Sequence, residues 1–582
     1  MKTTDGKIRI AGALLLSFLI TGLYFVLIYQ KIPFIYDIND DVAMRNVAAG
    51  VITGSPDAHL LHIKYLLGLL ISGLYTVLPG WDWYGLVMTG IFLFSFSMIL
   101  YRGLVSEKSL LWKAVYTVFA LLLFTAMGLQ HITAFQWTVT AAMAGGSGIY
   151  LFCTAETKER FQLCLEEGIA VVLILFSLAI RDDVFLMTLP IAGVCFLWKY
   201  FTFEKGSRFP FRLAHLGVPL GLLSGVILIM GVEAYAYRSP EWKEFRSYNV
   251  DREAIMDYYG LQNYEEAPEF YDSLGITPEE AENMQRYSLY LVDGLYSEKM
   301  AQIAAHSKEA YLQQHPFRER VVTALGDIRE HLTKESYYPA NYICIAAILI
   351  TLAVCFLKNR KDFYLGLVFL VIWGLYWFYL GYRDRMIERV GFSLYFLGFL
   401  TMLALWYRTI PSFGRKTCRT AAAVFLLLLV PVCAKTWKKV ETNNRWRWEY
   451  NQEFLDVNRY MAEHGENVYF MTTFSIETYT DNFTVKRDFA FSNLLSVGGW
   501  HTFSPLENEK NAKLGIQDPK SDIVKKDNVY VISLENINLR YMDRYYENIY
   551  GENYQGRELT DRLEYGERVF EVYDFNAEEE KE

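Results

Sequence analysis

The sequence predicts a polytopic α-helical membrane protein of about 11 crossings, with an outer helical insertion and a small outer α/β C-terminal domain. Three observations support this fold class. The 582-residue chain is 53% hydrophobic and 16% aromatic. It contains many apolar runs of roughly 18 residues or more, each long enough to cross a bilayer core of about 30 Å. Two long polar stretches, 236–338 and 438–582, interrupt and follow these runs.

The apolar runs place the predicted crossings along the chain. The first run, Ile10 to Tyr29, follows Lys2, Lys7 and Arg9. Because it is too long for the apolar core of a signal peptide, we expect it to remain as a helix. The predicted crossings are 10–30, 83–101, 113–129, 134–153, 165–180, 184–201, 213–235, 340–357, 363–381, 390–407 and 420–436.

The charges of the loops predict the orientation. With a cytoplasmic N-terminus, five alternate loops that are rich in Lys and Arg all fall in the cytoplasm, as the positive-inside rule expects. We therefore expect a multi-pass protein of the cell membrane with an extracytoplasmic C-terminal domain. The basic residues are Arg102, Lys108 and Lys113; Lys158 and Arg160; Lys199, Lys205, Arg208 and Arg212; Lys358, Arg360 and Lys361; and Arg408, Arg415, Lys416 and Arg419.

One apolar stretch, His59 to Leu78, is not counted as a crossing. Counting it would move all five basic loops to the outer side. Its flanks are polar at one end and aromatic at the other, in Pro79-Gly-Trp-Asp-Trp-Tyr84, which is typical of a membrane surface. We expect a helix that lies along or dips into the outer interface. An ordinary crossing is the alternative.

These elements divide the chain into four parts. Residues 1–235 form an N-terminal transmembrane core whose first outer loop is 31–82, and residues 339–437 form a second transmembrane bundle. The outer insertion 236–338 is predicted to be helical, and Thr277-Pro-Glu-Glu280 is a capping box in it. In the outer domain 438–582 we expect a helix at 451–464, strands at 467–472, 528–533 and 568–573, and a disordered acidic tail at 576–582.

Composition excludes several classes of function. A net charge of −9 and no concentrated basic region argue against a nucleic-acid partner. The seven cysteines lie in or beside apolar runs without metal-type spacing, so disulfides and a zinc site are not expected. No P-loop occurs, and no cytoplasmic segment is long enough for a nucleotide-binding domain.

Two adjacent carboxylates, Asp40 and Asp41, open the segment that leads to Gly50 about ten residues beyond the first crossing. In one interpretation Asn39 or Asp40 is the N-cap of a short surface helix. In the other, the pair is a catalytic site, because two like charges near an apolar surface repel each other unless a cation, metal or substrate hydroxyl compensates.

The order of these parts resembles the GT-C glycosyltransferases, among them protein O-mannosyltransferases and aminoarabinose transferases. The resemblance covers mainly residues 1–101, with Asp40 and Asp41 as the first and second acids and Ala48-Ala-Gly50 as the end of the following helix. It implies an acid that acts on the acceptor and a sugar donor on a polyprenyl phosphate. The chain departs from the usual pattern after Gly54, where Ser55-Pro-Asp-Ala-His59 replaces a Lys-Pro-Pro or His-Pro-Pro element.

An outer loop between the ninth and tenth crossings is the clearest exception to the positive-inside pattern. It carries Arg383, Arg385 and Arg389. Guanidinium groups bind phosphate in a bidentate manner, and the last two share one helical face, so we expect these residues to bind the donor phosphate. The alternative is local pairing with Asp384 and Glu388 at the membrane surface.

Other outer loops offer possible substrate or metal contacts. Arg181, Asp182 and Asp183 stand in a short connection and, with the acidic pair, would suit a divalent cation such as Mg or Mn; the alternative is a solvated turn. His131 and Gln136 are candidates for lining a sugar site, or else belong to an interfacial girdle. The turn Gly498-Gly-Trp-His501 is a further candidate for an acceptor contact, although a lone His beside Trp is usually structural.

Three functions are compatible with the sequence. The first is a membrane glycosyltransferase that takes sugar from a polyprenyl-phosphate donor and modifies a cell-envelope glycan, lipid or protein at the outer face. The second is a lipid-linked glycan flippase or transporter; against it, most predicted crossings have no charged residue well inside, whereas coupled transport usually leaves one at midplane. The third is a non-catalytic membrane component of polysaccharide assembly.

Overall fold

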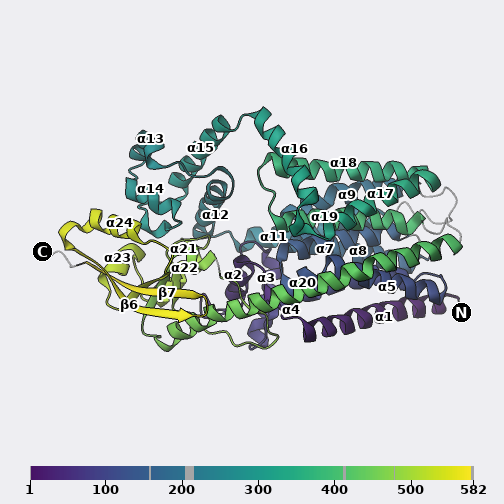
Figure 1. Ribbon diagram of the computed structural model, residues 1–582, viewed down its shortest axis with the longest axis horizontal. Helices are drawn as coiled ribbons and strands as arrows, with labels where there is room; N and C mark the ends of the chain where they lie inside the picture. The colour runs from purple at the N-terminus through teal and green to yellow at the C-terminus, as the bar shows by residue number, and fades with distance from the viewer. Residues whose placement is uncertain (1, 156–158, 203–214, 410–414, 478, 578–582) are drawn as a thin grey trace.

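The computed structural model of the protein describes residues 2–155, 159–202, 215–409, 415–477 and 479–577. These residues form a long helical bundle that continues at one end into a helical insertion and a small sheet domain (Figure 1). The predicted class of polytopic helical membrane protein with a small α/β domain is confirmed. Four predicted loop residues, Lys158, Lys205, Arg208 and Arg212, and tail residues 578–582 lie outside the described residues.

Nine helices in the described ranges are long and apolar enough to cross a membrane, and they correspond to nine of the predicted crossings. Their outer faces carry exposed apolar side chains suited to lipid, for example Leu15 at 72% and Ile227 at 63% exposure. The nine are α1 (Lys2–Lys31), α4 (Trp83–Leu104), α5 (Leu110–Met127), α8 (Arg160–Ile180), α9 (Asp182–Thr202), α11 (Gly217–Ala236), α17 (Ala340–Lys358), α18 (Arg360–Tyr382) and α19 (Glu388–Thr409).

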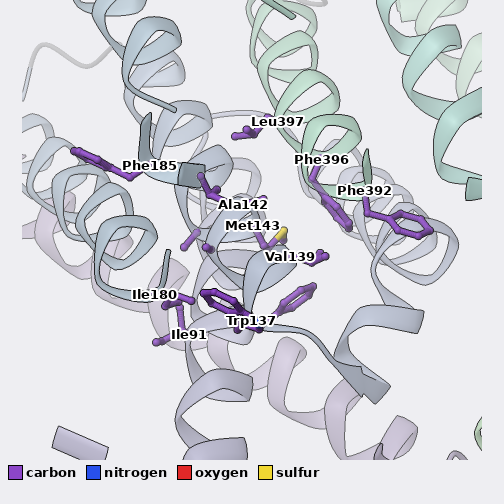
Figure 2. Packing of buried hydrophobic residues seen from close by; sticks show 14 of the residues in the cluster. Ile91, Trp137, Val139, Ala142, Met143, Ile180, Phe185, Phe392, Phe396 and Leu397 are labelled. Atoms are coloured by element: carbon purple, nitrogen blue, oxygen red, sulfur yellow. The ribbon is translucent and has the colours of Figure 1, made fainter. Parts of the chain in front are cut away.

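Helix α7 (Trp137–Thr154) coincides with a tenth predicted crossing and is buried at every residue. A Cβ at Gly146 would lie 2.8 Å from Leu400, and one at Gly148 would lie 2.9 Å from the carbonyl oxygen of Ala170. Small residues therefore let α8 and α19 pack closely against α7. Figure 2 shows side chains of these neighbours around Ala142 and Met143. Because protein surrounds α7, it needs less apolar character than the helices that face lipid.

Helix α20 (Arg415–Glu463) includes the last predicted crossing and is the longest element of the described chain. At 49 residues it spans about 74 Å. It runs the length of the bundle and extends into the C-terminal domain (Figure 1). The single helix therefore links the membrane part to the sheet.

The loops that the charge rule assigned to one side do meet at one end of the bundle. Arg408 donates a hydrogen bond to the carbonyl oxygen of Cys153, Lys199 donates to that of Ala155, and the Tyr407 hydroxyl donates to that of Arg102. The insertion and the sheet domain lie at the opposite end (Figure 1). The sidedness of the loops relative to one another agrees with the prediction.

The first predicted outer loop folds into short elements against the bundle. Its apolar stretch forms α3, which at 13 residues is about 20 Å long and too short to cross a bilayer core of about 30 Å. A segment of the C-terminal domain joins the loop, because Asn482 forms an antiparallel bridge with Ile35 and Lys486 forms one with Trp81. The elements of this loop are β1 (Ile35–Tyr36), α2 (Asn39–Ala49) and α3 (Tyr65–Val77). The connection between α5 and α7 adds α6 (Leu129–Thr133) and β2 (Ala134–Phe135), and β1 pairs with β2 in parallel.

The insertion is helical, as predicted. The capping box is present: Thr277 Oγ1 accepts from the backbone N–H of Glu280 at 3.2 Å, and the Glu280 carboxylate accepts from that of Thr277 at 2.9 Å. The elements are α12 (Pro240–Ala254), η1 (Ile255–Tyr259), η2 (Tyr264–Glu266), α13 (Pro268–Ser273), α14 (Pro278–Gln285), η3 (Leu289–Leu291), α15 (Ser297–Gln314), α16 (Phe317–Thr333) and η4 (Glu335–Tyr337).

The C-terminal domain is a five-stranded mixed sheet in the order β4-β3-β5-β7-β6. The predicted strands are β3, β5 and β7, while β4 and β6 were not predicted. Phe454 and Val457 of α20 pack with Phe570 in one cluster, and Met542 and Val531 belong to another. The elements are β3 (Val468–Met471), α21 (Thr473–Glu477), β4 (Leu494–Ser496), α22 (Pro505–Lys513), α23 (Pro519–Lys525), β5 (Val529–Leu534), α24 (Arg540–Tyr550), η6 (Gly551–Asn553), β6 (Tyr554–Tyr565) and β7 (Arg568–Ala577).

Candidate active site

Helix α2 carries the acidic pair in its first turn. Its N-cap is Ile38, which makes no side-chain cap bond, so the interpretation in which Asn39 or Asp40 caps the helix is wrong. In the first turn, Asp40 and Asp41 lie beside the free backbone N–H groups, where negative charge is favoured. The helix ends at Gly50 with φ 83°, and a Cβ there would lie 2.6 Å from the carbonyl carbon of Ser55, so this turn requires glycine.

Asp41 is completely buried, at 0% exposure. Its Oδ1 accepts a hydrogen bond from the Tyr84 hydroxyl at 2.8 Å, and its Oδ2 has no partner among the described residues. Burial raises the pKa of Asp41 well above 3.8; the Tyr84 bond opposes this, and the neighbouring charges of Asp40 and Asp37 add to it. Asp41 therefore fastens α2 to α4 and does not face solvent.

Asp40 is the accessible member of the pair and faces one of the predicted arginines. Its Oδ2 lies 3.9 Å from Nη2 of Arg389, and the two side chains are 20% and 26% exposed. The Nε of Arg389 is buried without a hydrogen-bond partner in the described part of the chain. Asp40 and Arg389, which are far apart in the sequence, therefore lie close together, and the Nε–H of Arg389 is an unused hydrogen-bond donor within the described chain.

The other two predicted phosphate ligands contact the helical insertion. Arg385 donates to the carboxylate of Asp257 at 2.8 Å and to its backbone carbonyl at 3.1 Å. The guanidinium groups of Arg383 and Arg385 lie 4.8 and 4.9 Å from the ring centre of Tyr258. Glu388 pairs with Lys334 at 3.7 Å. Arg383 and Arg385 are therefore held by η1, and of the three predicted arginines Arg389 is the one that faces Asp40.

Arg181 comes close to the acidic pair from the loop before α9. It donates to Thr138 Oγ1 at 2.9 Å, pairs with Asp183 at 3.4 Å and lies 4.4 Å over the Trp137 ring. Its charge acts on His62 of the first loop, as do the charges of Asp40 and Arg389. Arg181 and Arg389 are thus the two predicted cations that share an electrostatic environment with the acidic pair.

The remaining predicted contacts are placed elsewhere. Asp182 pairs with Lys64 at 2.9 Å. His131 is buried against the rings of Phe392 and Phe396. Gln136 is the N-cap of α7, where its side chain accepts from the backbone N–H of Val139 at 2.9 Å.

Within the described ranges, the structure has no group of three or more His, Cys, Asp or Glu side chains that could hold a metal ion. Asp182 and Asp183, proposed above as oxygen ligands, each have a cationic partner. The use of a divalent cation remains a prediction without a ligand set in these residues.

Sequence reasoning missed His62 as a site residue. Its ring lies 5.4 Å from that of Trp137 and 4.8 Å from that of Trp500, in the turn that follows β4. In the sequence, His62 stands out only as a polar flank of an apolar stretch. Trp500 belongs to the Gly498–His501 turn, which the structure brings over the first loop.

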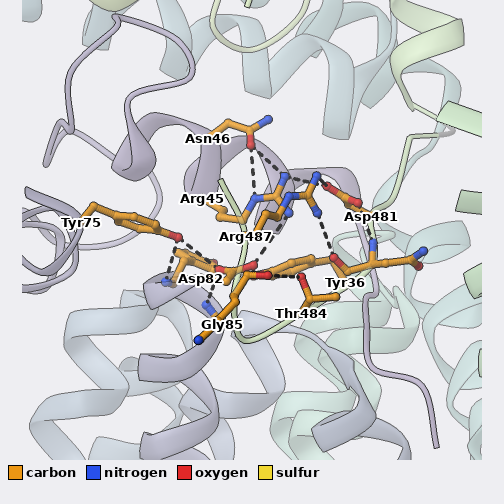
Figure 3. Close-up of polar contacts among 12 residues, drawn as sticks. Tyr36, Arg45, Asn46, Tyr75, Asp82, Gly85, Asp481, Thr484 and Arg487 are labelled. Carbon is orange, nitrogen blue, oxygen red and sulfur yellow. Dashed lines mark hydrogen bonds and ion pairs between the residues drawn. The ribbon is translucent and has the colours of Figure 1, made fainter. Parts of the chain in front are cut away.

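A buried ionic network joins α2 to the C-terminal domain (Figure 3). Arg45, 1% exposed, donates to the Asp481 carboxylate at 2.7 Å and lies 4.0 Å from that of Asp82. Arg487 also pairs with Asp481 at 2.8 Å, and the Tyr36 hydroxyl donates to Asp82 at 2.7 Å. Burial acts to raise the pKa of Asp481, but Arg45 and Arg487 outweigh it and hold that pKa below 3.8. The orientation of α2 therefore depends on residues far along the chain.

Comparison with known proteins gives distant structural likenesses. No family model and no curated protein matches the sequence. The chain is similar to ArnT from Cupriavidus metallidurans bound to undecaprenyl phosphate, with 10% identity, a TM-score of 0.40 and coverage of 98% of each chain. In the apo state of ArnT the TM-score is 0.41. The arabinofuranosyltransferase AftD from mycobacteria has 11% identity and a TM-score of 0.37, over 98% of this chain and 40% of that one. At these values the likeness assigns no role to any residue of this chain.

Proposed function

We propose that this chain is a membrane glycosyltransferase. It moves a sugar from a polyprenyl-phosphate donor to a hydroxyl group of a cell-envelope glycan, lipid or protein at the outer face. The observation that carries the proposal is the 3.9 Å approach of Asp40 and Arg389, which stand in the first turns of α2 and α19, about 350 residues apart in the sequence. A base for the acceptor and a cation for the donor phosphate are the two groups that this reaction needs.

The groups present suit the bond changes. Asp40 accepts the proton of the acceptor hydroxyl, whose oxygen forms a bond to the anomeric carbon of the sugar. The bond from that carbon to the phosphate oxygen breaks, and polyprenyl phosphate leaves. Arg389, with a free Nε donor in the described surroundings, and Arg181 neutralise the charge of the departing phosphate. Asp41 is buried, so its role is to hold α2 in place.

The alternatives explain less of this arrangement. A non-catalytic assembly component has no need of an accessible carboxylate that faces an arginine whose Nε has no partner among the described residues. A transporter usually keeps its charged residues along a path through the bundle. Here Asp40, Arg181 and Arg389 all stand at helix ends beside the outer elements.

The proposal predicts the outcome of a transfer assay. Membranes with the full-length protein receive polyprenyl-phosphate sugars that were radiolabelled metabolically and extracted from the source cells, and label in envelope polymers is counted. Asp40→Asn removes the base and should lower transfer by about 100-fold or more. Arg389→Met removes charge from the phosphate site and should also lower transfer by at least about 10-fold.

The matched control is Asp456→Asn. Asp456 forms a surface pair with Arg459 and lies on α20, away from the first loop. We expect transfer at the wild-type rate in this variant. Wild-type transfer by Asp40→Asn, in protein that is present at normal amounts, would refute the assignment.

A further inference from the structure

Three aromatic side chains from distant parts of the chain meet in the first outer loop. The His62 ring lies 5.4 Å from the Trp137 ring at an interplanar angle of 27°, and 4.8 Å from the Trp500 ring at 49°. Trp500 stacks in turn on His501 at 3.7 Å. His62 precedes α3, Trp137 begins α7 and Trp500 follows β4, so the group exists only when the C-terminal domain is docked.

His62 is held by its ring faces and not by its nitrogens. Neither ring nitrogen has a hydrogen-bond partner in the part of the chain that the structure describes. The histidine three residues earlier differs, because His59 bonds the Asp57 carboxylate at 2.7 Å and stacks on Trp242. The nitrogens of His62 therefore remain available to a ligand.

Burial, reinforced by nearby arginines, keeps His62 neutral. Burial lowers its pKa to about 4; Asp40 opposes this shift, and Arg181, Arg252 and Arg389 add to it. At neutral pH one ring nitrogen is then a hydrogen-bond acceptor and the other a donor. The same interactions show that His62 shares the environment of the proposed reaction centre.

Backbone strain accompanies this group. Among the described residues, four that are not glycine have positive φ: Leu61, Tyr287, Asp384 and Phe503. Leu61 at 63° directly precedes His62, and Phe503 at 67° follows the Trp500 turn. Such conformations persist where the surrounding structure enforces them, and they gather at ligand sites.

We propose that His62, held between Trp137 and Trp500, forms a subsite for a hydroxyl-bearing sugar ring. The inference rests on the proposed function, of which it describes the sugar contact. The imidazole accepts a hydrogen bond from a sugar hydroxyl. Trp137, which is 4% exposed and lies beneath Arg181, and Trp500, which stacks on His501, hold the imidazole in place. Trp500 makes the C-terminal domain part of the substrate site.

Two substitutions at His62 distinguish a hydrogen bond from its nitrogens to the sugar from packing of its ring between the two indoles. His62→Phe keeps a ring between the two indoles and loses both nitrogens, whereas His62→Gln loses the ring and keeps a neutral acceptor and donor. In the transfer assay with metabolically radiolabelled polyprenyl-phosphate sugars, we expect at least a 10-fold loss for the Phe variant and a loss of only a few-fold for the Gln variant.

Other results overturn the subsite. A packing role predicts the reverse order, with Phe tolerated and Gln inactive. Equal losses in both variants, or none in either, would also contradict it. His59→Phe, in the same loop, is the matched control and should transfer at the wild-type rate.

The same membranes distinguish the two proposals. An inactive Asp40→Asn variant beside a fully active His62→Phe variant would remove the subsite and leave the proposed function standing. No transfer by the wild-type protein, or normal transfer by Asp40→Asn, would remove both.

Discussion

Asp41 is completely buried, and one of its carboxylate oxygens has no partner in the described chain. Ionising this side chain therefore lowers the free energy of unfolding, by an amount that depends on pH. Its pKa in the folded state lies well above 3.8, the ordinary value that applies in the unfolded chain. Between these two pKa values, the folded protein therefore holds a proton that the unfolded chain has released. The free energy of unfolding falls as pH rises from about 4 toward the folded-state pKa, by about 1.4 kcal/mol for each pH unit in that interval.

Asp41→Asn should remove this dependence. The amide cannot ionise, and its oxygen still accepts the hydrogen bond from Tyr84. We expect the Tm of the variant to exceed that of the wild type at pH 8 and the two values to converge near pH 4. Thermal unfolding of the detergent-solubilised protein across this range measures the difference. A constant offset at every pH would show that Asp41 titrates normally.

At the scale of elements, the sequence predicted the helices and strands that have a local signature, such as an apolar run or a capping motif. The apolar runs, the capping box at Thr277 and three of the five strands were all found. The N-cap of α2 was missed, because Ile38 contributes backbone geometry and no side-chain bond. β6 was missed because its side chains are largely exposed, so it lacks an apolar pattern.

The candidate site was only partly predictable, for a physical reason. Asp40 and Arg389 each stand out locally, by charge in an unusual place. Arg45 and His62 do not, since their partners Asp481 and Trp500 are contributed by the C-terminal domain. Periodicity and spacing report neighbours along an element and carry no information about such pairs.

The contact between α2 and the C-terminal domain should be essential for stability. Arg45→Met leaves Asp82 and Asp481 buried with one cation fewer, and removal of one partner of a buried pair costs about 3–5 kcal/mol. We expect a lower Tm and faster proteolysis within residues 479–491, which join the first loop.

Arg459→Met is the control for this change. Arg459 is 66% exposed and pairs with Asp456 on the surface, so its loss should alter stability by no more than about 0.5 kcal/mol. Equal effects of the two substitutions would mean that the buried network adds nothing.

At the scale of the whole molecule, loop charge predicts the side on which the site lies. In a background with the exposed Cys164 replaced by Ser, a cysteine at exposed Asn536 of the C-terminal domain should react with a membrane-impermeant maleimide on intact cells. A cysteine at exposed Lys108, at the opposite end of the bundle, should react only after permeabilisation. The opposite labelling pattern would place the site in the cytoplasm.

The ionic network also determines how late during synthesis the site can assemble, because its two halves come from opposite ends of the chain. Arg45 and Asp481 are 436 residues apart, so at roughly 5–20 residues per second the ribosome needs roughly 20–90 s to add the partner. Until then Arg45 has no Asp481 to pair with, and His62 has no Trp500 beside it. A chain that stops before Asp481 therefore lacks the carboxylate that holds Arg45, and with it the contact that orients α2. Under the proposed function, growing and truncated chains lack the complete site until the C-terminal domain has been added.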